Sequence, residues 1–347
     1  MSKRVEGKSR SAGPAEAGVV SNGTRLRLVS TSGFVIDATT SAEDGLLREF
    51  YSDYDRAFVL ENEKEGYDGF VECLRLNDGA QYDDLVRRYG PFREFVIVVR
   101  EAATGARVAG ANFIIFPLSP KSSTKNSTKQ TRSLALSMNL NYVFVNSESR
   151  RQGVFRRLVG DLPDIAYRLF AETNASDLPK EWRDAAKRAS MPQIYMFIEQ
   201  NDPFRMSTED YERDTKLTGL DQVVRIGLWS RLGAKIVDFP YVQPPLSKDQ
   251  AAEQTLAYGV LGAADAALDA CLLRAHFERF FGISVLKGAD LSLEPTAAAQ
   301  LSELSIACNN GRRIPLLDAS TSMMGSTLAD HSANRPATLR EALRRTQ

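Results

Sequence analysis

The amino-acid sequence predicts an α+β fold in which helices flank a mixed, mostly antiparallel, twisted sheet. Apolar runs at 92–100, 107–117 and 134–145 are typical of buried strands, and the polar stretch 101–105 is short enough for a hairpin loop between the first two. The third run leads through a glycine turn into a basic, amphipathic helix that starts at about Gly153. An antiparallel meander followed by a helix therefore forms the centre of the predicted domain.

The N-terminal part is expected to contain a tail, a strand or hairpin and two helical regions. Residues 1–24 have too few large apolar side chains to offset the entropy of ordering, so we expect a disordered tail. A strand or hairpin follows within 25–36. The stretch Thr40-Ser-Ala-Glu-Asp44 is an N-cap signal for a helix that ends near Val59. A second helical region spans 69–89, with its Asn-Asp-Gly triplet as a candidate break.

The second half is expected to continue with a strand, a helix and two strands, and then to become helical. The expected ranges are 192–200, 220–232, 234–242 and 255–262. We therefore place the main domain at 25–262. A helical C-terminal extension at 263–317, packed on the core, contains an aromatic-rich helix at 264–281 and a further helix at 295–308. Residues 318–347 are expected to form a mostly disordered tail with a basic helical stub.

Two polar stretches interrupt this pattern. Residues 118–133 contain four basic and no acidic side chains and many Ser and Thr residues, which is typical of a long mobile loop. Such a loop could close over a substrate, and the alternative is a solvated insertion. Residues 171–190 are polar and are expected to form an inserted helix.

The glycine turn has the features of a phosphate-binding site. Val154 and Leu158 begin an apolar face at helical spacing, while Arg156 lies on the opposite face. Free N–H groups at a helix start and the helix macrodipole attract a phosphate if the backbone is bare enough to approach, and Gly153 gives that access. On this segment alone, an ordinary strand-to-helix connection with a solvated basic face remains the alternative.

The residue order of the turn resembles a motif of a known family. Arg150-Arg-Gln-Gly-Val-Phe155 resembles the acyl-CoA-binding turn of the GCN5-related N-acetyltransferase (GNAT) superfamily, commonly Q/R-x-x-G-x-G/A. Arg150 and Gly153 match the first two fixed positions. Phe155 departs from the third, where a small residue is usual. Its side chain could turn into the core while its N–H still serves the phosphates.

The element order extends this resemblance over about residues 25–262. In GNAT proteins, a strand after the phosphate-binding helix is followed by a helix whose end carries a glycine-containing motif. The segment Leu228-Trp-Ser-Arg-Leu-Gly-Ala234 lies at the corresponding position of this chain. The frequent general acid of the family is a tyrosine, and it aligns with Trp229. An indole N–H cannot act as an acid near neutral pH, so the sequence supports cofactor binding more strongly than any particular catalytic residue.

The resemblance implies an acyl-CoA-dependent N-acyltransferase that uses acetyl-CoA or another acyl-CoA as co-substrate and no metal. It implies direct attack by an amine acceptor, a small molecule or a protein, in a ternary complex. A non-catalytic acyl-CoA sensor or scaffold with the GNAT fold is the alternative. The predicted cofactor contacts are Tyr142, Val143 and Val145 of the strand, and Arg150, Arg151, Gln152, Gly153, Val154, Phe155 and Arg156 of the turn.

Candidate catalytic and acceptor residues lie on the following strand and beyond it. Glu199 is the acid nearest the expected pocket and is the candidate base, the alternative being an edge or surface carboxylate. Tyr241 is a candidate acid, with Tyr195 or solvent as alternatives. The candidate acceptor contacts are Asn201, Phe204 and Tyr211.

Composition restricts the class of protein. The 347 residues carry 44 basic and 44 acidic side chains, so no whole-chain field favours a nucleic acid or a membrane as partner. A third functional hypothesis is a nucleic-acid binder that uses the basic stretch 118–133, and the balanced net charge argues against it. No run of about 18 apolar residues and no secretory signal occurs, so we expect a cytoplasmic protein. A homodimer through the C-terminal extension is a further expectation.

The three cysteines are widely spaced and odd in number, and the chain has two histidines. A disulfide or a zinc site is therefore not expected. Each of Cys73, Cys271 and Cys308 is expected to be a small core residue.

Overall fold

A computed structural model of the chain describes residues 18–58, 64–118, 135–174, 192–247, 250–319 and 336–346. The stretch 119–134, which holds most of the basic loop, and the second part of the expected inserted helix lie outside the described residues. The described strands form one sheet in the order β1-β2-β3-β4-β5-β6-β7-β9-β8-β11-β10. The strands are β1 Val20–Asn22, β2 Arg25–Val29, β3 Phe34–Thr39, β4 Arg93–Glu101, β5 Arg107–Leu118, β6 Ala135–Val145, β7 Gln193–Asn201, β8 Lys235–Val237, β9 Leu256–Leu261, β10 Ala267–Asp269 and β11 Arg313–Leu317.

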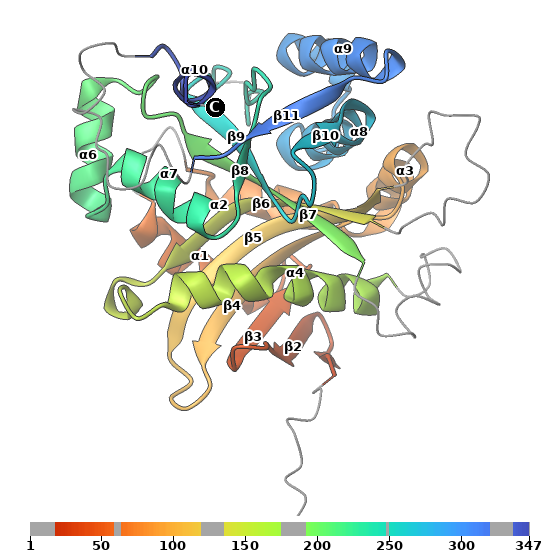
Figure 1. Ribbon diagram of the computed structural model, residues 1–347. Helices are drawn as coiled ribbons and strands as arrows, with labels where there is room; N and C mark the ends of the chain where they lie inside the picture. The colour runs from red at the N-terminus through yellow and green to blue at the C-terminus, as the bar shows by residue number, and fades with distance from the viewer. Residues whose placement is uncertain are drawn as a thin grey trace, which may run out of the picture.

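Helices lie on both faces of this sheet and around the strands that come last in the chain (Figure 1). They are α1 Gly45–Ala57, α2 Tyr67–Arg75, α3 Gly79–Tyr89, α4 Val154–Thr173, α6 Thr208–Thr218, α7 Gln222–Arg231, α8 Ala270–Phe280, α9 Pro295–Asn309 and α10 Leu339–Arg344, with short turns η2 Ser147–Ser149, η3 Phe281–Val285 and η4 Leu291–Leu293. The expected break in the second helical region is confirmed, because α2 and α3 are separate helices.

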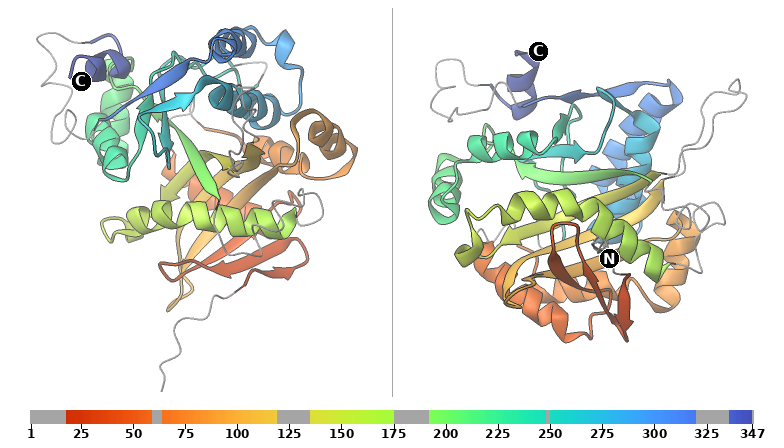
Figure 2. Two further views of the ribbon diagram at one scale, coloured as in Figure 1. Left: turned by 45° about the vertical axis from the view of Figure 1, so that its right-hand side comes forward. Right: turned by 60° about the horizontal axis from the view of Figure 1, so that its bottom comes forward.

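The predicted mixed, mostly antiparallel sheet flanked by helices is confirmed. Among the described strands, β6 and β7 pair in parallel and all other pairs are antiparallel. Because two parallel strands cannot be joined by a tight turn, the chain crosses over between them, and α4 is part of that crossover. Figure 2 shows α4 running across the sheet, with β2 and β3 at one end of the molecule and the C-terminal elements at the other.

The central strand β4 shows why the sheet is covered on both faces. Its side chains Phe95, Ile97 and Val99 belong to the buried cluster that contains the apolar face of α4. The alternate side chains Val96 and Val98 belong to the cluster with α1 and α2. A strand buried on both faces becomes a continuous apolar run rather than an alternating one, as the sequence of β4 is.

The C-terminal part differs from the purely helical extension that the sequence predicts. It contains two strands as well as α8 and α9, and β11 joins the sheet through Leu316 opposite Val237 on β8. Exposed and buried residues alternate along Arg313–Leu317 up to Leu316, which is the period of a half-buried strand. The stretch is too short for this alternation to have marked it in advance.

Parts of both expected tails are also ordered. Residues 20–22 form β1, paired with β2. At the other end, Leu339 and Leu343 of α10 are fully buried against α7 and its neighbours. The carboxylate of Asp202 accepts the Leu339 N–H at 2.8 Å. The last described helix is therefore fixed to the end of β7.

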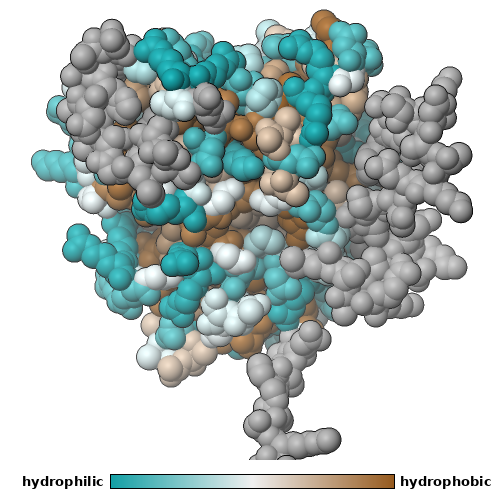
Figure 3. Space-filling model, in the orientation of Figure 1, coloured by the Kyte–Doolittle hydropathy of each residue, from teal (hydrophilic) through white to brown (hydrophobic). Residues whose placement is uncertain are grey.

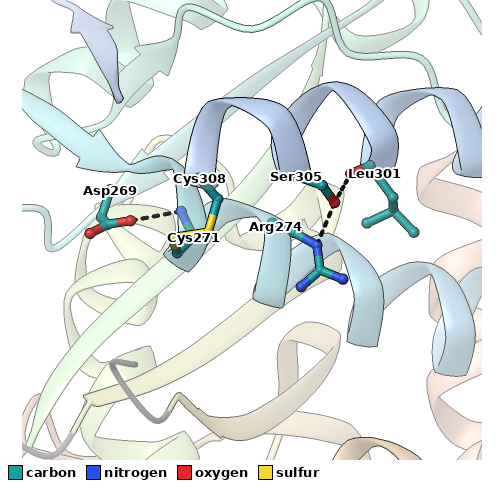
Figure 4. The surroundings of a disulfide bond; sticks show 6 residues. All are labelled: Asp269, Cys271, Arg274, Leu301, Ser305 and Cys308. Atoms are coloured by element: carbon teal, nitrogen blue, oxygen red, sulfur yellow. Dashed lines mark hydrogen bonds between the residues drawn. A yellow bond between two sulfur atoms is a disulfide. The ribbon is translucent and has the colours of Figure 1, made fainter. Parts of the chain in front are cut away.

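The cysteines correct a second expectation. Cys271 at the start of α8 and Cys308 near the end of α9 form a disulfide (Figure 4). The two helices lie side by side, and Arg274 Nε donates to Ser305 Oγ at 2.8 Å one turn further along. The spacing of the cysteines gave no sign of this helix pairing. Cys73 is a buried free cysteine, as expected. Disulfides persist mainly in oxidising compartments, so the cytoplasmic location stays a prediction.

Candidate functional site

The two parallel strands β6 and β7 separate partway along their length. Their pairing runs from Ala135 opposite Gln193 to Leu140 opposite Ile198. Beyond these residues β7 continues as Glu199–Asn201, which pairs with β9 instead. The end of β6, Tyr142–Val145, pairs only with β5 among the described strands. A gap therefore opens between Tyr142–Val145 and Glu199–Asn201.

A β-bulge lies where the strands separate. In the β5–β6 pair, Asn112 is opposite Tyr142 while Phe113 is opposite Leu140, so Asn141 has no residue opposite it. The Asn141 side chain donates to Asn112 Oδ1 at 3.0 Å. Bulges redirect side chains and are common beside active sites, and this one turns an amide toward the gap.

The backbone of β6 directs hydrogen-bonding groups toward the gap. Asn146 N–H donates to Val108 O on β5 at 2.9 Å. Because alternate residues of an antiparallel strand face the same neighbour, Val143 and Val145 direct their N–H and C=O groups away from β5. The Val145 carbonyl accepts a hydrogen bond from Arg150 Nε at 3.3 Å. Val143 and Val145 line the cavity described below. Tyr142 also lines the cavity, and its side chain packs beside Tyr54, with ring centroids 4.9 Å apart.

The turn after β6 presents bare N–H groups. Gly153 is the N-cap of α4 with φ +74°, in the left-handed region, and no side chain caps the helix. The first intrahelical bond runs from Arg157 N–H to Gly153 O at 3.1 Å. The N–H groups of Val154, Phe155 and Arg156 precede it and have no intrahelical acceptor. With the positive end of the helix macrodipole, they form a site suited to an anion.

The side chains of the turn divide into two groups. Arg150 and Arg151 line the cavity, whereas Gln152 and Arg156 are exposed and do not. Val154 is buried in the core cluster under α4. Val154 could therefore contact a ligand only through its backbone, and the contacts of the exposed Gln152 and Arg156 stay predictions.

Phe155 turns inward, as the sequence allowed. Its ring packs edge to face on Trp229 of α7, with centroids 5.0 Å apart. Both residues line the cavity, and Trp229 is 5% exposed. The aromatic pair closes one side of the cavity beside the turn, and it leaves the Phe155 N–H available.

One cavity of about 810 Å³ is lined by residues of the gap and by Arg150, Arg151 and Phe155 of the turn. On the face seen in Figure 3, apolar side chains show between α4 and the C-terminal elements. We call the part formed by Arg150, Arg151, Phe155 and Trp229 the turn end. We call the part formed by Cys73, Asn141 and Ser284 the inner end. Other lining residues include Phe58, Glu65, Phe70, Asn112, Val143, Val145, Ile198, Glu199, Gln200, Asn201, Arg225, Gln243, Glu253, Phe280 and Val285.

Glu199 lies in the gap and lines the cavity. Tyr241 Oη donates a hydrogen bond to Glu199 Oε1, and Gln243 Nε2 donates to Oε2 at 3.5 Å. Burial raises the pKa of Glu199 to about 7, against the opposing effect of the Tyr241 hydrogen bond. A carboxyl with this pKa can accept a proton near neutral pH.

Tyr241 itself does not reach the cavity. Its side chain is 2% exposed and stacks on Tyr258, with ring centroids 4.4 Å apart. Burial, with the nearby Glu199 carboxyl, holds the pKa of Tyr241 well above its usual range. Its proton is engaged with Glu199, so the structure makes it a positioning residue for Glu199 rather than the acid that the sequence suggested.

The three predicted acceptor contacts fall in different places. Asn201 lines the cavity. Phe204 is 6% exposed and packs in the cluster that holds α7 and α10. Tyr211 on α6 donates its hydroxyl hydrogen to Asp221. Phe204 and Tyr211 do not line the cavity, because their side chains join α6 and the end of β7 to α7 and α10.

Sequence reasoning missed two polar residues near the inner end. Glu94 is fully buried on β4, and burial raises its pKa to about 7. Ser284 comes from η3, which lies 190 positions further along the chain. A glutamate inside the apolar run Arg-Glu-Phe-Val-Ile-Val-Val was a signal for Glu94. Nothing in the sequence connects Ser284 to it.

Comparison with known proteins finds no matching family model, and none of the curated proteins is similar. Two solved acetyltransferase structures are similar to the chain. The ribosomal-protein-S18-alanine N-acetyltransferase from Escherichia coli is 14% identical with a TM-score of 0.31, over 67% of this chain and 96% of that chain. The histone acetyltransferase HPA2 and related acetyltransferase from Corynebacterium glutamicum is 15% identical with a TM-score of 0.27, over 63% and 92%.

Both similar structures are of acetyltransferases by name. Their identities and TM-scores are too low to carry an argument about substrate or mechanism, which is drawn below from the residues of this chain. Within the described residues, no group of three or more His, Cys, Asp or Glu side chains could hold a metal ion. No described helix is long and apolar enough to cross a membrane.

Proposed function

We propose that the protein is an acyl-CoA-dependent N-acyltransferase that transfers an acetyl group from acetyl-CoA to an amine. The observation that carries this proposal is the meeting of three features in one cavity. The gap between β6 and β7 exposes backbone groups, the turn at Gly153 exposes helix N–H groups, and Glu199 lies between the two strands.

The residues of the turn end fit the co-substrate. The N–H groups at Val154, Phe155 and Arg156 would hold the pyrophosphate, while Arg150 and Arg151 would add charge. A Cβ on Gly153 would meet no atom within 4 Å, so no described side chain crowds the turn at this position. The backbone groups of Val143 and the N–H of Val145, which point away from β5, would hold the pantetheine arm as an extended strand is held.

Glu199 would perform the proton transfer. When bound, acetyl-CoA supplies the activated acyl group as a thioester. The carboxylate of Glu199 would take a proton from the protonated amine and make it a nucleophile, while Tyr241 and Gln243 hold that carboxylate in place. Trp229 cannot supply a proton, and a thiol with a pKa of about 8.5 can leave without one.

Two measurements test the proposal. Acetyl-CoA should raise the thermal unfolding temperature of the protein, because a ligand that binds only the folded state stabilises it. Incubation with acetyl-CoA and a panel of amines should release free thiol. Absence of protection by any acyl-CoA would contradict the proposal. Protection without thiol release from any amine would leave the non-catalytic sensor as the function.

A further inference from the structure

The segment 241–243 carries two hydrogen-bond donors of Glu199, yet it belongs to no helix or strand. Tyr241 and Gln243 donate to the two oxygens of the Glu199 carboxyl. The strand β8 ends at Val237, and β9 is the next strand along the described part of the chain. In a regular strand, alternate residues are held by the backbone of a neighbouring strand. The position of the two donors is therefore set in another way.

The side chain of Gln300 on α9 holds the backbone between the two donors. Val242 N–H donates to Gln300 Oε1 at 3.1 Å, and Gln300 Nε2 donates to Val242 O at 2.7 Å. These backbone groups belong to the two peptide bonds that link Tyr241 to Gln243. The next residue, Gln243, exchanges backbone hydrogen bonds of 3.0 and 2.9 Å with Glu253. The Gln300 amide thus takes the place of a neighbouring strand at Val242.

Gln300 is itself fixed in one orientation. It is 6% exposed, and its Nε2 also donates to Thr296 O at 3.1 Å on the same helix. Only one orientation of the amide fits, because Val242 N–H needs an acceptor and the two carbonyls need donors. Gln300 does not line the cavity. Any effect of this residue on the reaction must therefore pass through the segment that it holds.

The helix α9 belongs to the C-terminal part of the chain, beyond the range that the family resemblance covers. The disulfide and the hydrogen bond from Arg274 to Ser305 attach it to α8 (Figure 4). Ala297 and Leu304 of α9 are fully buried in the cluster that contains Tyr241. The C-terminal extension and the segment that holds Glu199 are therefore parts of one packed unit.

We propose that Gln300 is a positioning residue for the acyl transfer, and that the C-terminal extension thereby completes the catalytic site. This inference rests on the proposed function. By fixing both peptide bonds of the segment, Gln300 keeps the Tyr241 hydroxyl and the Gln243 amide directed at the Glu199 carboxyl. The alternative is a purely structural role, in which the amide only joins α9 to the core. Loss of the amide would then lower stability and leave Glu199 unchanged.

The titration of Glu199 distinguishes the two roles. The Tyr241 hydrogen bond opposes the rise in the pKa of Glu199 that burial causes. Tyr142 and Tyr258 also sense the Glu199 charge, and burial keeps the pKa of both well above its usual range. His276, which is hydrogen-bonded to Tyr258 at 2.6 Å, stays neutral because burial holds its pKa well below its usual value. A change in the pKa of Glu199 therefore reports on its own hydrogen bonds.

Infrared difference spectroscopy of the full-length protein as a function of pH measures this pKa without turnover. Glu199→Gln identifies the band of the Glu199 carboxyl. Gln300→Met removes the amide and keeps the length of the side chain. It should raise the pKa of Glu199 by about one pH unit, and no further than Tyr241→Phe raises it, with an equal displacement of the ascending limb of kcat/KM. Gln300→Asn, which shortens the amide, should act in the same direction by less.

Asn77→Leu is the matched control. Asn77 is 2% exposed and holds another backbone segment in the same way: Glu94 N–H donates to Asn77 Oδ1 at 2.9 Å, and Asn77 Nδ2 donates to Glu94 O at 3.0 Å. Asn77→Leu and Gln300→Met should both lower the unfolding temperature, because each leaves buried backbone groups unpaired. Asn77→Leu should leave the pKa of Glu199 unchanged. An equal rise of this pKa in both variants would overturn the inference.

A double variant tests the route of the effect. Since Gln300 acts mainly through Tyr241, the rise caused by Gln300→Met should fall to less than about half in the Tyr241→Phe background. Fully additive rises would overturn the inference.

Failure of this inference can be told apart from failure of the proposed function. An unchanged pKa of Glu199 in Gln300→Met, with thiol release at the wild-type pH dependence, would overturn the positioning role and leave the acyltransferase standing. A raised pKa in Gln300→Met without protection by any acyl-CoA would instead overturn the acyltransferase and keep the support of Glu199 by Gln300.

Discussion

The two ends of the cavity are built in different ways. Most of the turn end comes from one continuous segment, in which β6, the turn and the first residues of α4 supply backbone groups and arginines, and Trp229 of α7 closes its side. The inner end is assembled from α2, the β6 bulge and η3, with β4 behind it. A site made of backbone tolerates many side chains and is encoded locally. A site made of side chains depends on which distant elements the fold brings together.

Glu199 lies between these two ends, and its removal should have the largest effect on the reaction. Glu199→Gln should lower kcat by about 10²–10⁴-fold, the usual contribution of a general base. It should leave acetyl-CoA binding intact, because the turn end does not use this side chain. The wild-type kcat/KM should fall as pH decreases through about 7, since Glu199 must be deprotonated to accept a proton. A variant that keeps full activity would exclude Glu199 as the base.

Tyr241→Phe should have a smaller effect that is visible in the pH profile. The Tyr241 hydrogen bond lowers the pKa of Glu199, so its loss should move the ascending limb of the rate profile to higher pH. The activity at pH 7 should fall about tenfold. Tyr195→Phe, on the same strand as Glu199 but outside the cavity lining, is the control. An unchanged ascending limb would show that Tyr241 does not affect the pKa of Glu199.

Glu94→Gln should increase stability at alkaline pH. The pKa of Glu94 is raised from its usual 4.5 to about 7 in the folded protein, so the folded state holds a proton that the unfolded chain releases between these values. Stability therefore decreases as pH rises from 4.5 to 7. The variant lacks this loss and should gain about 1–3 kcal/mol at pH 8 and little at pH 4. Urea unfolding at both pH values measures this, and an equal gain at both would contradict the buried carboxyl.

Trp229→Tyr should have the smallest effect. A tyrosine ring can keep the contact with Phe155 while it restores a hydroxyl in the place where the resemblance expects an acid. Because the thiolate leaves without help, the rate should change by less than about threefold. A large increase would show that protonation of the leaving group limits the wild-type protein.

The same contrast explains what the sequence could and could not predict. The strands from β2 to β7, the strand β9 and the start of α4 at Gly153 were predictable, because each depends on neighbouring residues. The inward turn of Phe155 was also foreseen as an option. The pairing of Cys271 with Cys308, the strand β11 and the inner position of Ser284 were not, because each depends on contacts between segments far apart in the chain.

Two predicted acceptor contacts show the same limit of prediction from the sequence, because neither lines the cavity. Phe204 and Tyr211 were selected because they follow the strand that carries Glu199 in the sequence. Both side chains connect helices instead. Phe204 packs with α7 and α10, and the Tyr211 hydroxyl donates a hydrogen bond to Asp221. Position in the chain does not determine which way a side chain points.

The central claim, that the turn end binds acyl-CoA through bare backbone, is tested most directly by a matched pair of glycines. Gly153 and Gly105 have φ values of +74° and +71°, and a Cβ on either would meet no atom within 4 Å. Replacement by Glu should therefore strain both sites alike. Titration calorimetry with acetyl-CoA should show wild-type affinity for Gly105→Glu and a loss of at least about 100-fold for Gly153→Glu. Equal affinity in the two variants would contradict the claim.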